Sequence, residues 1–207
     1  MTLEAWALFC LTETLLCLNP GPATLLVLSV ALTRGQVAGL FASIGVLAAN
    51  AVYFTLSASG LVAVHAVSAQ AFRAIKWAGA AYLIWLGARM ILRSFRTQPD
   101  AAPERPAVRA SRSFWQGFTT QAANPNLLVY FAAILPQFVD ARQPLPGQVA
   151  ILAGSSFVIE LAVLSIYAAL ASRAGQRAAP RFRRIAERCA GGLLIAAGAG
   201  LAALRRA

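Results

Sequence analysis

The stretch "CLNPGPATLL", Cys17–Leu26, places two prolines and a glycine inside an otherwise apolar segment. A second apolar segment has a similar interruption much later in the chain, in "AANPNLLVYF", Ala122–Phe131. In both segments an Asn-Pro pair lies at the interruption. Proline removes a helical hydrogen bond and collides with the preceding turn. The two stretches therefore predict two helices that are broken at matching places.

The composition indicates a membrane protein. The chain has 207 residues, of which 59% are hydrophobic and 12% are charged, whereas soluble domains carry about a quarter charged residues. Apolar runs of ~20 residues are long enough to cross a bilayer. Six such segments occur, at 3–30, 39–64, 74–92, 114–138, 149–171 and 185–204. We therefore expect an all-α membrane protein with six transmembrane helices, of which the first and fourth are broken at proline.

The two halves of the chain resemble each other. A polar, proline-rich and basic stretch separates them, so we expect a single transmembrane domain with a first three-helix repeat at 1–95, a linker at 96–112 and a second repeat at 113–207. The stretch "WAGAAYLIWLGARMILRS", 77–94, corresponds to "CAGGLLIAAGAGLAALRR", 189–206. Because each half has an odd number of spans, the halves enter the membrane from opposite sides. Such an inverted repeat is typical of transporters with a site near the midplane.

The basic residues predict the orientation. The side with more Arg and Lys is expected to be cytoplasmic, which places linker 96–112 inside and both termini outside. This topology explains the basic residues and hence the net charge of +11, so we expect no nucleic-acid partner. Thirteen arginines fall on the richer side, at 34, 89, 93, 96, 105, 109, 112, 173, 177, 181, 183, 184 and 188. Five basic residues fall on the other side, at 73, 76, 142, 205 and 206.

The two interruptions also indicate a substrate pathway. Backbone groups freed by a break must be buried in protein or face a wet cavity, and paired interrupted helices are the best sequence sign of a binding site. The amide side chains there can bind a carboxylate or an amine, or cap the freed backbone, and both roles stay open. The expected pathway residues are Asn19, Pro20, Gly21, Pro22, Asn50, Asn124, Pro125 and Asn126.

Two acidic residues, Glu13 and Glu160, lie inside apolar spans. Ionisable residues at this depth are costly, which makes a functional role the first hypothesis. We expect them to couple transport to protons, as a proton relay or as a counter-charge for a substrate ammonium group. The structural alternative is a protonated carboxyl that is hydrogen-bonded to a neighbouring helix. In a rough alignment of the repeats, Glu160 falls opposite Asn50.

Small residues predict close helix packing. The spacing of Gly192, Ala196 and Gly200 favours tight contact of the last helix with a neighbouring helix or with a second subunit, which would make a homodimer. Other glycines for which we expect a packing role are Gly39, Gly45, Gly79, Gly87 and Gly154.

Metal and cofactor chemistry is not indicated. His65 is the only histidine, and the three cysteines, Cys10, Cys17 and Cys189, form no C-x-x-C motif. We expect no bound metal, no cofactor and no enzyme activity.

The sequence resembles the lysine exporter / homoserine-threonine resistance (LysE/RhtB) family of amino-acid exporters along nearly its whole length. The residues that carry the resemblance are Pro20-Gly21-Pro22, the Arg34-Gly35 turn, "GAAYLIWLGARMI" at 79–91, and "FWQGFTTQAANPNLLVYFAAILPQFV" at 114–139. The resemblance implies a small, multi-pass protein of the bacterial inner membrane. It also implies export of an amino acid or derivative by antiport with protons.

Two other functions compete with amino-acid export. A transmembrane thiol-disulfide carrier needs a cysteine pair from matching helices, and the fourth segment has no cysteine. A heavy-metal exporter needs thiolate, thioether or imidazole ligands, which are scarce in this chain. Neutral, basic and modified amino acids all remain compatible with the sequence as substrates.

Overall fold

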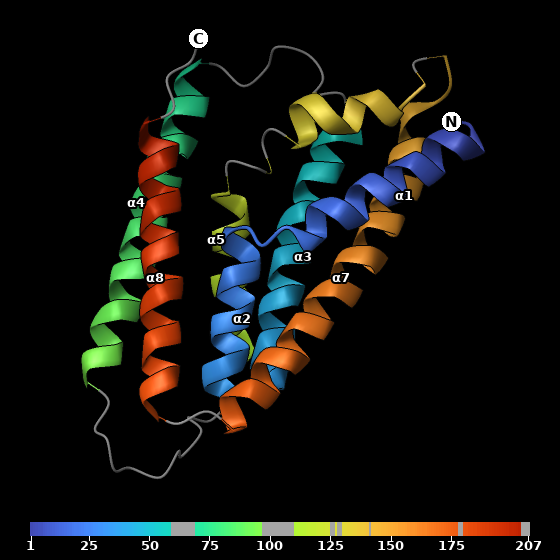
Figure 1. The fold of residues 1–207 in the computed structure, drawn as a ribbon. Coiled ribbons are helices and arrows are strands. Elements are labelled where there is room, and N and C mark those ends of the chain that lie inside the picture. Colours follow the sequence, from blue (N-terminus) through green and yellow to red (C-terminus); the bar gives the residue numbers. More distant parts are fainter. Residues whose placement is uncertain are drawn as a thin grey trace.

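The computed structural model describes residues 1–58, 69–96, 110–124, 127, 130–140, 142–177 and 180–203. Within these ranges every regular element is helical (Figure 1). The expected pathway residues Pro125 and Asn126, and most of the expected linker, lie outside the described residues. The elements are α1 (Leu3–Leu18), α2 (Pro22–Arg34), α3 (Gln36–Ala58), α4 (Ala69–Arg96), α5 (Ala110–Ala122), the π-helical turn η1 (Tyr130–Ile134), the 3₁₀ turn η2 (Leu135–Phe138), α7 (Leu145–Arg177) and α8 (Pro180–Ala203).

The first apolar segment is broken, as the sequence predicts. Helix α1 ends at Leu18, and α2 begins at Pro22 with a bend of 55° between the two axes. Asn19 has an extended backbone, and Gly21 forms the N-cap of α2. Proline suits the first position of a helix, because its missing N–H would have no partner within the helix there. The segment is therefore divided into two short helices.

The fourth segment is also interrupted. Helix α5 ends at Ala122, and Asn124 lies outside any helix while its backbone N–H donates to the Gln121 carbonyl (2.9 Å). Beyond the interruption, η1 and η2 lie across the upper end of α3 and are not in line with α5 (Figure 1). Pro136 lies in η2, a 3₁₀ turn whose hydrogen bonds do not follow the i→i+4 pattern of an α-helix.

Close packing joins the helices in four main pairs: α4 with α8, α3 with α5, α2 with α7, and α3 with α7. Glycines allow three of these pairs to come into backbone contact, and a Cβ added at Gly87 of α4 would lie 2.4 Å from the Gly191 carbonyl oxygen of α8. A Cβ added at Gly117 would lie 1.9 Å from the Ala42 carbonyl oxygen, and one added at Gly175 would lie 2.2 Å from the Leu32 carbonyl oxygen. Small residues permit such close approach of helices in membranes. The main core lies between these helices and includes Leu26, Val27, Val46, Leu83, Leu86, Leu164 and Leu194.

One packing prediction for α8 is wrong within this chain. A Cβ added at Gly192 or Gly200 would meet nothing within 4 Å, and Ala196 is exposed. The glycines of α8 that touch α4 are Gly191 and Gly198. Successive residues of a helix point about 100° apart, so a shift of one position moves the stripe to another face. Gly154 likewise faces open space, whereas Gly39, Gly45, Gly79 and Gly87 are packed as predicted.

The length and composition of the described helices fit a multi-pass membrane protein. Helices α3 and α7 are each long and apolar enough to cross a bilayer, and the bent pair α1 and α2 could make a third span. A shorter apolar stretch lies at Trp77–Leu92 in α4. The outer face of α1 is covered by exposed leucines, namely Leu3, Leu8, Leu11, Leu15, Leu16 and Leu18. An apolar surface of this kind suits contact with lipid.

Candidate functional site

A buried polar network connects the two broken segments through α7. Two residues of this helix, Ser156 and Glu160, carry the connection. They are four positions apart and therefore lie on the same face of the helix. Ser156 contacts α1, before the first break, and Glu160 contacts α3, which is hydrogen-bonded to α5 just before the second break. Helix α7 runs obliquely across the molecule and reaches all of these elements (Figure 1).

The first part of the network surrounds Glu13. Only Phe9 and Glu13 are buried among the α1 residues, so the carboxyl lies on the face that packs against α7. Ser156 Oγ donates a hydrogen bond to Glu13 Oε1 (2.5 Å), and the Cys17 thiol lies 4.0 Å from the same oxygen. The ring of Tyr130 from η1 brings its hydroxyl beside this carboxyl. Residues from both broken segments thus meet at Glu13.

The second part of the network is a chain of three amides that ends on Glu160. Asn124 Nδ2 donates to Gln121 Oε1 (3.0 Å), Gln121 Nε2 donates to Asn50 Oδ1 (2.8 Å), and Asn50 Nδ2 donates to Glu160 Oε2 (2.5 Å). The three amide side chains are each no more than 6% exposed. Because unpaired buried polar groups are costly, these bonds hold α5, α3 and α7 in a fixed relation.

Two glycines place the amides opposite each other. Gly45 of α3 and Gly117 of α5 lie where the two backbones touch, since a Cβ at Gly45 would lie 2.0 Å from the Phe114 carbonyl oxygen. The two helices run in the same direction from this contact (Figure 1). Asn50 is five residues beyond Gly45, and Gln121 is four residues beyond Gly117. Rises of 1.5 Å per residue bring the two side chains to about the same level.

The expected pathway residues do not all join this network. Asn50 and Asn124 are members, but Asn19 and Pro20 are exposed at the first break, and Gly21 is half-buried. Pro22 is buried as the first residue of α2. The first break contacts α7 in another way, because the Tyr167 hydroxyl donates to the Leu18 carbonyl (3.0 Å). Both expected proton-coupling residues, Glu13 and Glu160, are in the network.

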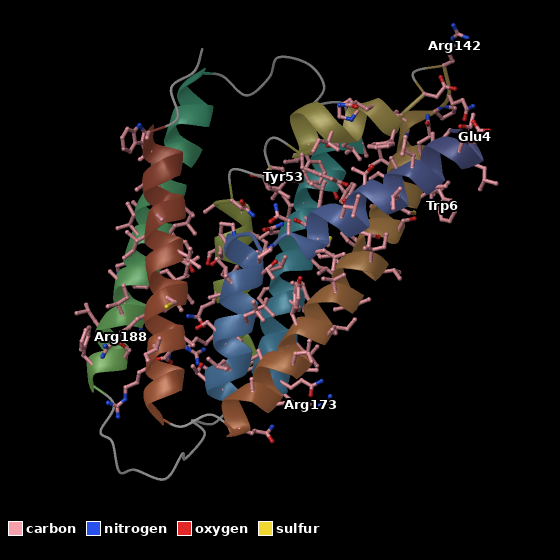
Figure 2. All side chains as sticks on the ribbon, viewed as in Figure 1. Glu4, Trp6, Tyr53, Arg142, Arg173 and Arg188 are labelled. Atoms are coloured by element: carbon pink, nitrogen blue, oxygen red, sulfur yellow. The ribbon has the colours of Figure 1, made fainter. Side chains whose placement is uncertain are left out.

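Three members were not singled out from the sequence: Gln121, Ser156 and Tyr130. A spacing signal exists for two of them. Gln121 is three residues before Asn124 in the chain, and Ser156 is four residues before Glu160 and shares its helical face, so each lies close to a residue that the sequence did indicate. Tyr53 is a peripheral contact, with its hydroxyl 3.4 Å from the Ala122 carbonyl oxygen; Figure 2 shows it near the upper end of α3.

The chemistry of the network is acidic and amide-rich. The hydrogen-bonding partners of the two carboxyls are neutral, namely Ser156 and Cys17 for Glu13 and Asn50 for Glu160. The carboxyls also lie within range of each other's charge. A site of this kind can take up a proton or a cationic group without a covalent step.

A separate surface groove of about 380 Å³ lies between α1 and η2. It is lined by Ala5, Leu8, Thr12, Leu16, Ile134, Gln137 and Phe138. None of these residues belongs to the polar network. The groove is mainly apolar, so its lining offers little to recognise a charged solute.

Broken apolar helices connected by buried acids and amides are typical of membrane transporters. The chain belongs to the LysE type translocator family, whose profile matches residues 14–205. Translocators of this family are transporters and not enzymes. The resemblance noted from the sequence is therefore confirmed.

Named relatives cover all or part of the chain. A homoserine/homoserine lactone efflux protein of Salmonella typhimurium is 32% identical over 210 residues, which cover 100% of both chains. A leucine efflux protein of Klebsiella pneumoniae is 30% identical over 130 residues, which cover 63% of this chain and 61% of the relative. An uncharacterized membrane protein of Vibrio cholerae is 33% identical over 182 residues, which cover 85% of each chain. No solved structure matches the chain.

Proposed function

We propose that this protein exports a small amino acid or an amino-acid derivative across the bacterial inner membrane, in exchange for protons. The observation that carries the proposal is the buried network in which Glu13 and Glu160 connect both broken segments. The names of the relatives, which include homoserine, homoserine lactone and leucine efflux, support the substrate class.

The proposed architecture is six transmembrane helices arranged as two inverted three-helix repeats. The pairing of the helices supports it: α3 packs against the broken segment of the second half, α7 packs against the broken segment of the first half, and α4 packs against α8. This is the pattern that a two-fold axis in the membrane plane would produce.

The proposed orientation has linker 96–112 in the cytoplasm and both termini outside. Figure 2 shows Arg173 and Arg188 at the end of the molecule opposite Glu4 and the N-terminus. The excess of basic residues at that end favours the cytoplasm. The outward-facing stripe of Gly192, Ala196 and Gly200 leaves α8 able to pack against a second subunit, and we include a homodimer in the proposal.

In the proposed mechanism the substrate passes between the two breaks. The pathway is lined by Asn19–Pro22, Asn50 and Asn124–Asn126, and amides at the breaks bind its polar groups. Glu160, assisted by Glu13, takes a proton from the outside, and the same proton leaves to the cytoplasm as substrate moves outward. A carboxylate suits this role because it is neutralised when a proton binds and can then change its partners.

Substrate release from cells tests the exporter proposal. Cells that lack their own exporters are loaded with L-homoserine or L-leucine, and the amount appearing outside is followed with and without the protein. Faster release of at least one of these amino acids is expected, while uncharged sugars should be retained equally. Equal release of both amino acids by cells with and without the protein, at confirmed expression, would contradict the proposal.

A further inference from the structure

The amide chain in the site has a single direction. The side-chain carbonyl oxygens of Gln121 and Asn50 each accept a bond from the preceding amide. Each amino group donates toward Glu160: Asn124 to Gln121, Gln121 to Asn50, and Asn50 to the carboxyl. We call Asn124, Gln121 and Asn50 the amide relay. A primary amide has its acceptor and its donors on opposite sides, so reversing one member leaves two donors or two acceptors facing each other.

The ionised form of Glu160 favours this direction of the amide bonds. A hydrogen bond from an amide to a carboxylate is roughly twice as strong as one to a neutral acceptor. Protonation of Glu160 therefore weakens the bond that anchors the relay at its acidic end. It also adds an O–H donor that prefers the carbonyl oxygen of Asn50. If Asn50 turned around to accept this bond, its amino group would face the amino group of Gln121, and two donors would meet.

The other end of the relay lies at the second break. Asn124 lies outside α5, directly after its end, and its backbone N–H and its side chain both bond to Gln121. Asn124 lies outside a regular helix, and its carbonyl accepts from the Leu127 N–H (3.1 Å), so Gln121 is bonded directly to a residue of the break itself. Gln121 lies at the middle of the relay and bonds to both amides, one on another helix and one at the break.

We propose that Gln121 is a positioning residue that transmits the charge state of Glu160, through Asn50, to Asn124 at the second break. This inference rests on the proposed function, in which Glu160 carries the proton. Among the described residues, the ionisable groups of other elements that lie within electrostatic range of Glu160 are Glu13 and Cys17 of α1 and Tyr130 of η1. These groups influence Glu160 electrostatically, whereas the amide relay contacts it through a hydrogen bond.

The test separates coupling from transport. Purified protein in proteoliposomes is assayed with radiolabelled L-homoserine and L-leucine, first for substrate exchange at equal pH and then for transport driven by an imposed pH gradient. Gln121→Met keeps the length of the side chain but removes both amide bonds. We expect gradient-driven transport to fall about tenfold more than exchange does, within the range that a lost coupling between two sites gives.

A second variant gives a signature that a merely structural residue would not. Gln121→Glu keeps an acceptor for Asn124 but offers a donor to Asn50 only when it is protonated. Its coupling should therefore recover at acidic pH, where Gln121→Met does not recover. The matched control is Gln116→Met on the same helix, which removes the bond from Arg34 Nη1 and leaves the relay intact. Gln116→Met should couple as the parent does.

Several outcomes would overturn the inference. Normal gradient-driven transport in Gln121→Met, or an equal loss of exchange and of gradient-driven transport, would show that Gln121 does not position the coupling. If Gln121→Met fails to insert, the pH profile of Gln121→Glu decides, and a profile parallel to the parent's overturns the inference. Failure of the proposed function looks different: the parent protein would move neither amino acid, or Glu160→Gln would remain coupled.

Discussion

Replacing Gly117 with alanine tests how the site is held together. The added Cβ would lie 1.9 Å from the Ala42 carbonyl oxygen, whereas ordinary van der Waals contact begins at 3.4 Å. Both groups belong to helix backbones and cannot turn away. Helices α3 and α5 would therefore have to separate by about 1.5 Å at this point. A shift of that size stretches the 2.8 Å bond from Gln121 to Asn50 beyond hydrogen-bonding distance.

The loss of stability in Gly117→Ala can be compared with the effect of the same substitution at a glycine that has no close neighbour. Overpacking of a well-packed interior costs about 1–3 kcal/mol. Gly154→Ala is the control, because its Cβ would meet nothing within 4 Å and alanine is also the better helix former there. For a chain of this length, each kcal/mol shifts the midpoint of thermal unfolding by about 2–4 °C. Gly117→Ala should therefore melt roughly 2–12 °C below Gly154→Ala.

The assay is thermal unfolding of both purified variants in detergent, alongside transport driven by a pH gradient in proteoliposomes. Gly117→Ala should lose stability and gradient-driven transport together, since the same displacement strains the packing and opens the amide relay. A melting midpoint for Gly117→Ala equal to that of Gly154→Ala, with unchanged gradient-driven transport, would mean that the α3–α5 contact does not set the geometry of the site.

Three further predictions concern the breaks, the acidic site and the topology. Changing Pro20 and Pro22 together to alanine should straighten the first segment and lower export more than it lowers the amount of protein in the membrane; unchanged export would make the prolines ordinary kinks. Ser156→Ala removes the hydroxyl that donates to Glu13 and should cost about 1–3 kcal/mol of stability, more than Ser165→Ala on the same helix, as measured by thermal unfolding. A reporter fused after Ala101 should behave as cytoplasmic and one fused at Ala207 as external, and a cytoplasmic C-terminus would overturn the proposed orientation.

Local chemistry made some of this structure predictable. The first break follows from Pro20 and Pro22 alone, because proline acts on its own turn of helix. The contact between Asn50 and Glu160 agrees with their opposite positions in the aligned repeats. Whether these residues carry substrate and protons stays a prediction.

Other features depend on how the helices are rotated against each other. The spacing of Gly192 and Gly200 is correct for close packing, yet Gly191 and Gly198 face α4. Sequence spacing gives the periodicity of a helical stripe but not the direction in which the stripe points. Gln121 was missed for a similar reason, since its partner Asn50 is on another helix and the bond depends on the α3–α5 contact.

Proton coupling through Glu160 can be measured by the response of Glu160→Gln to a pH gradient. The substitution keeps the shape of the side chain and an acceptor for Asn50 but cannot take up a proton. Efflux of L-homoserine from proteoliposomes is measured with and without an imposed gradient. The variant should insert and exchange substrate like the parent, while its efflux no longer responds to the gradient. A response equal to that of the parent would show that Glu160 is structural and that the proton is carried elsewhere.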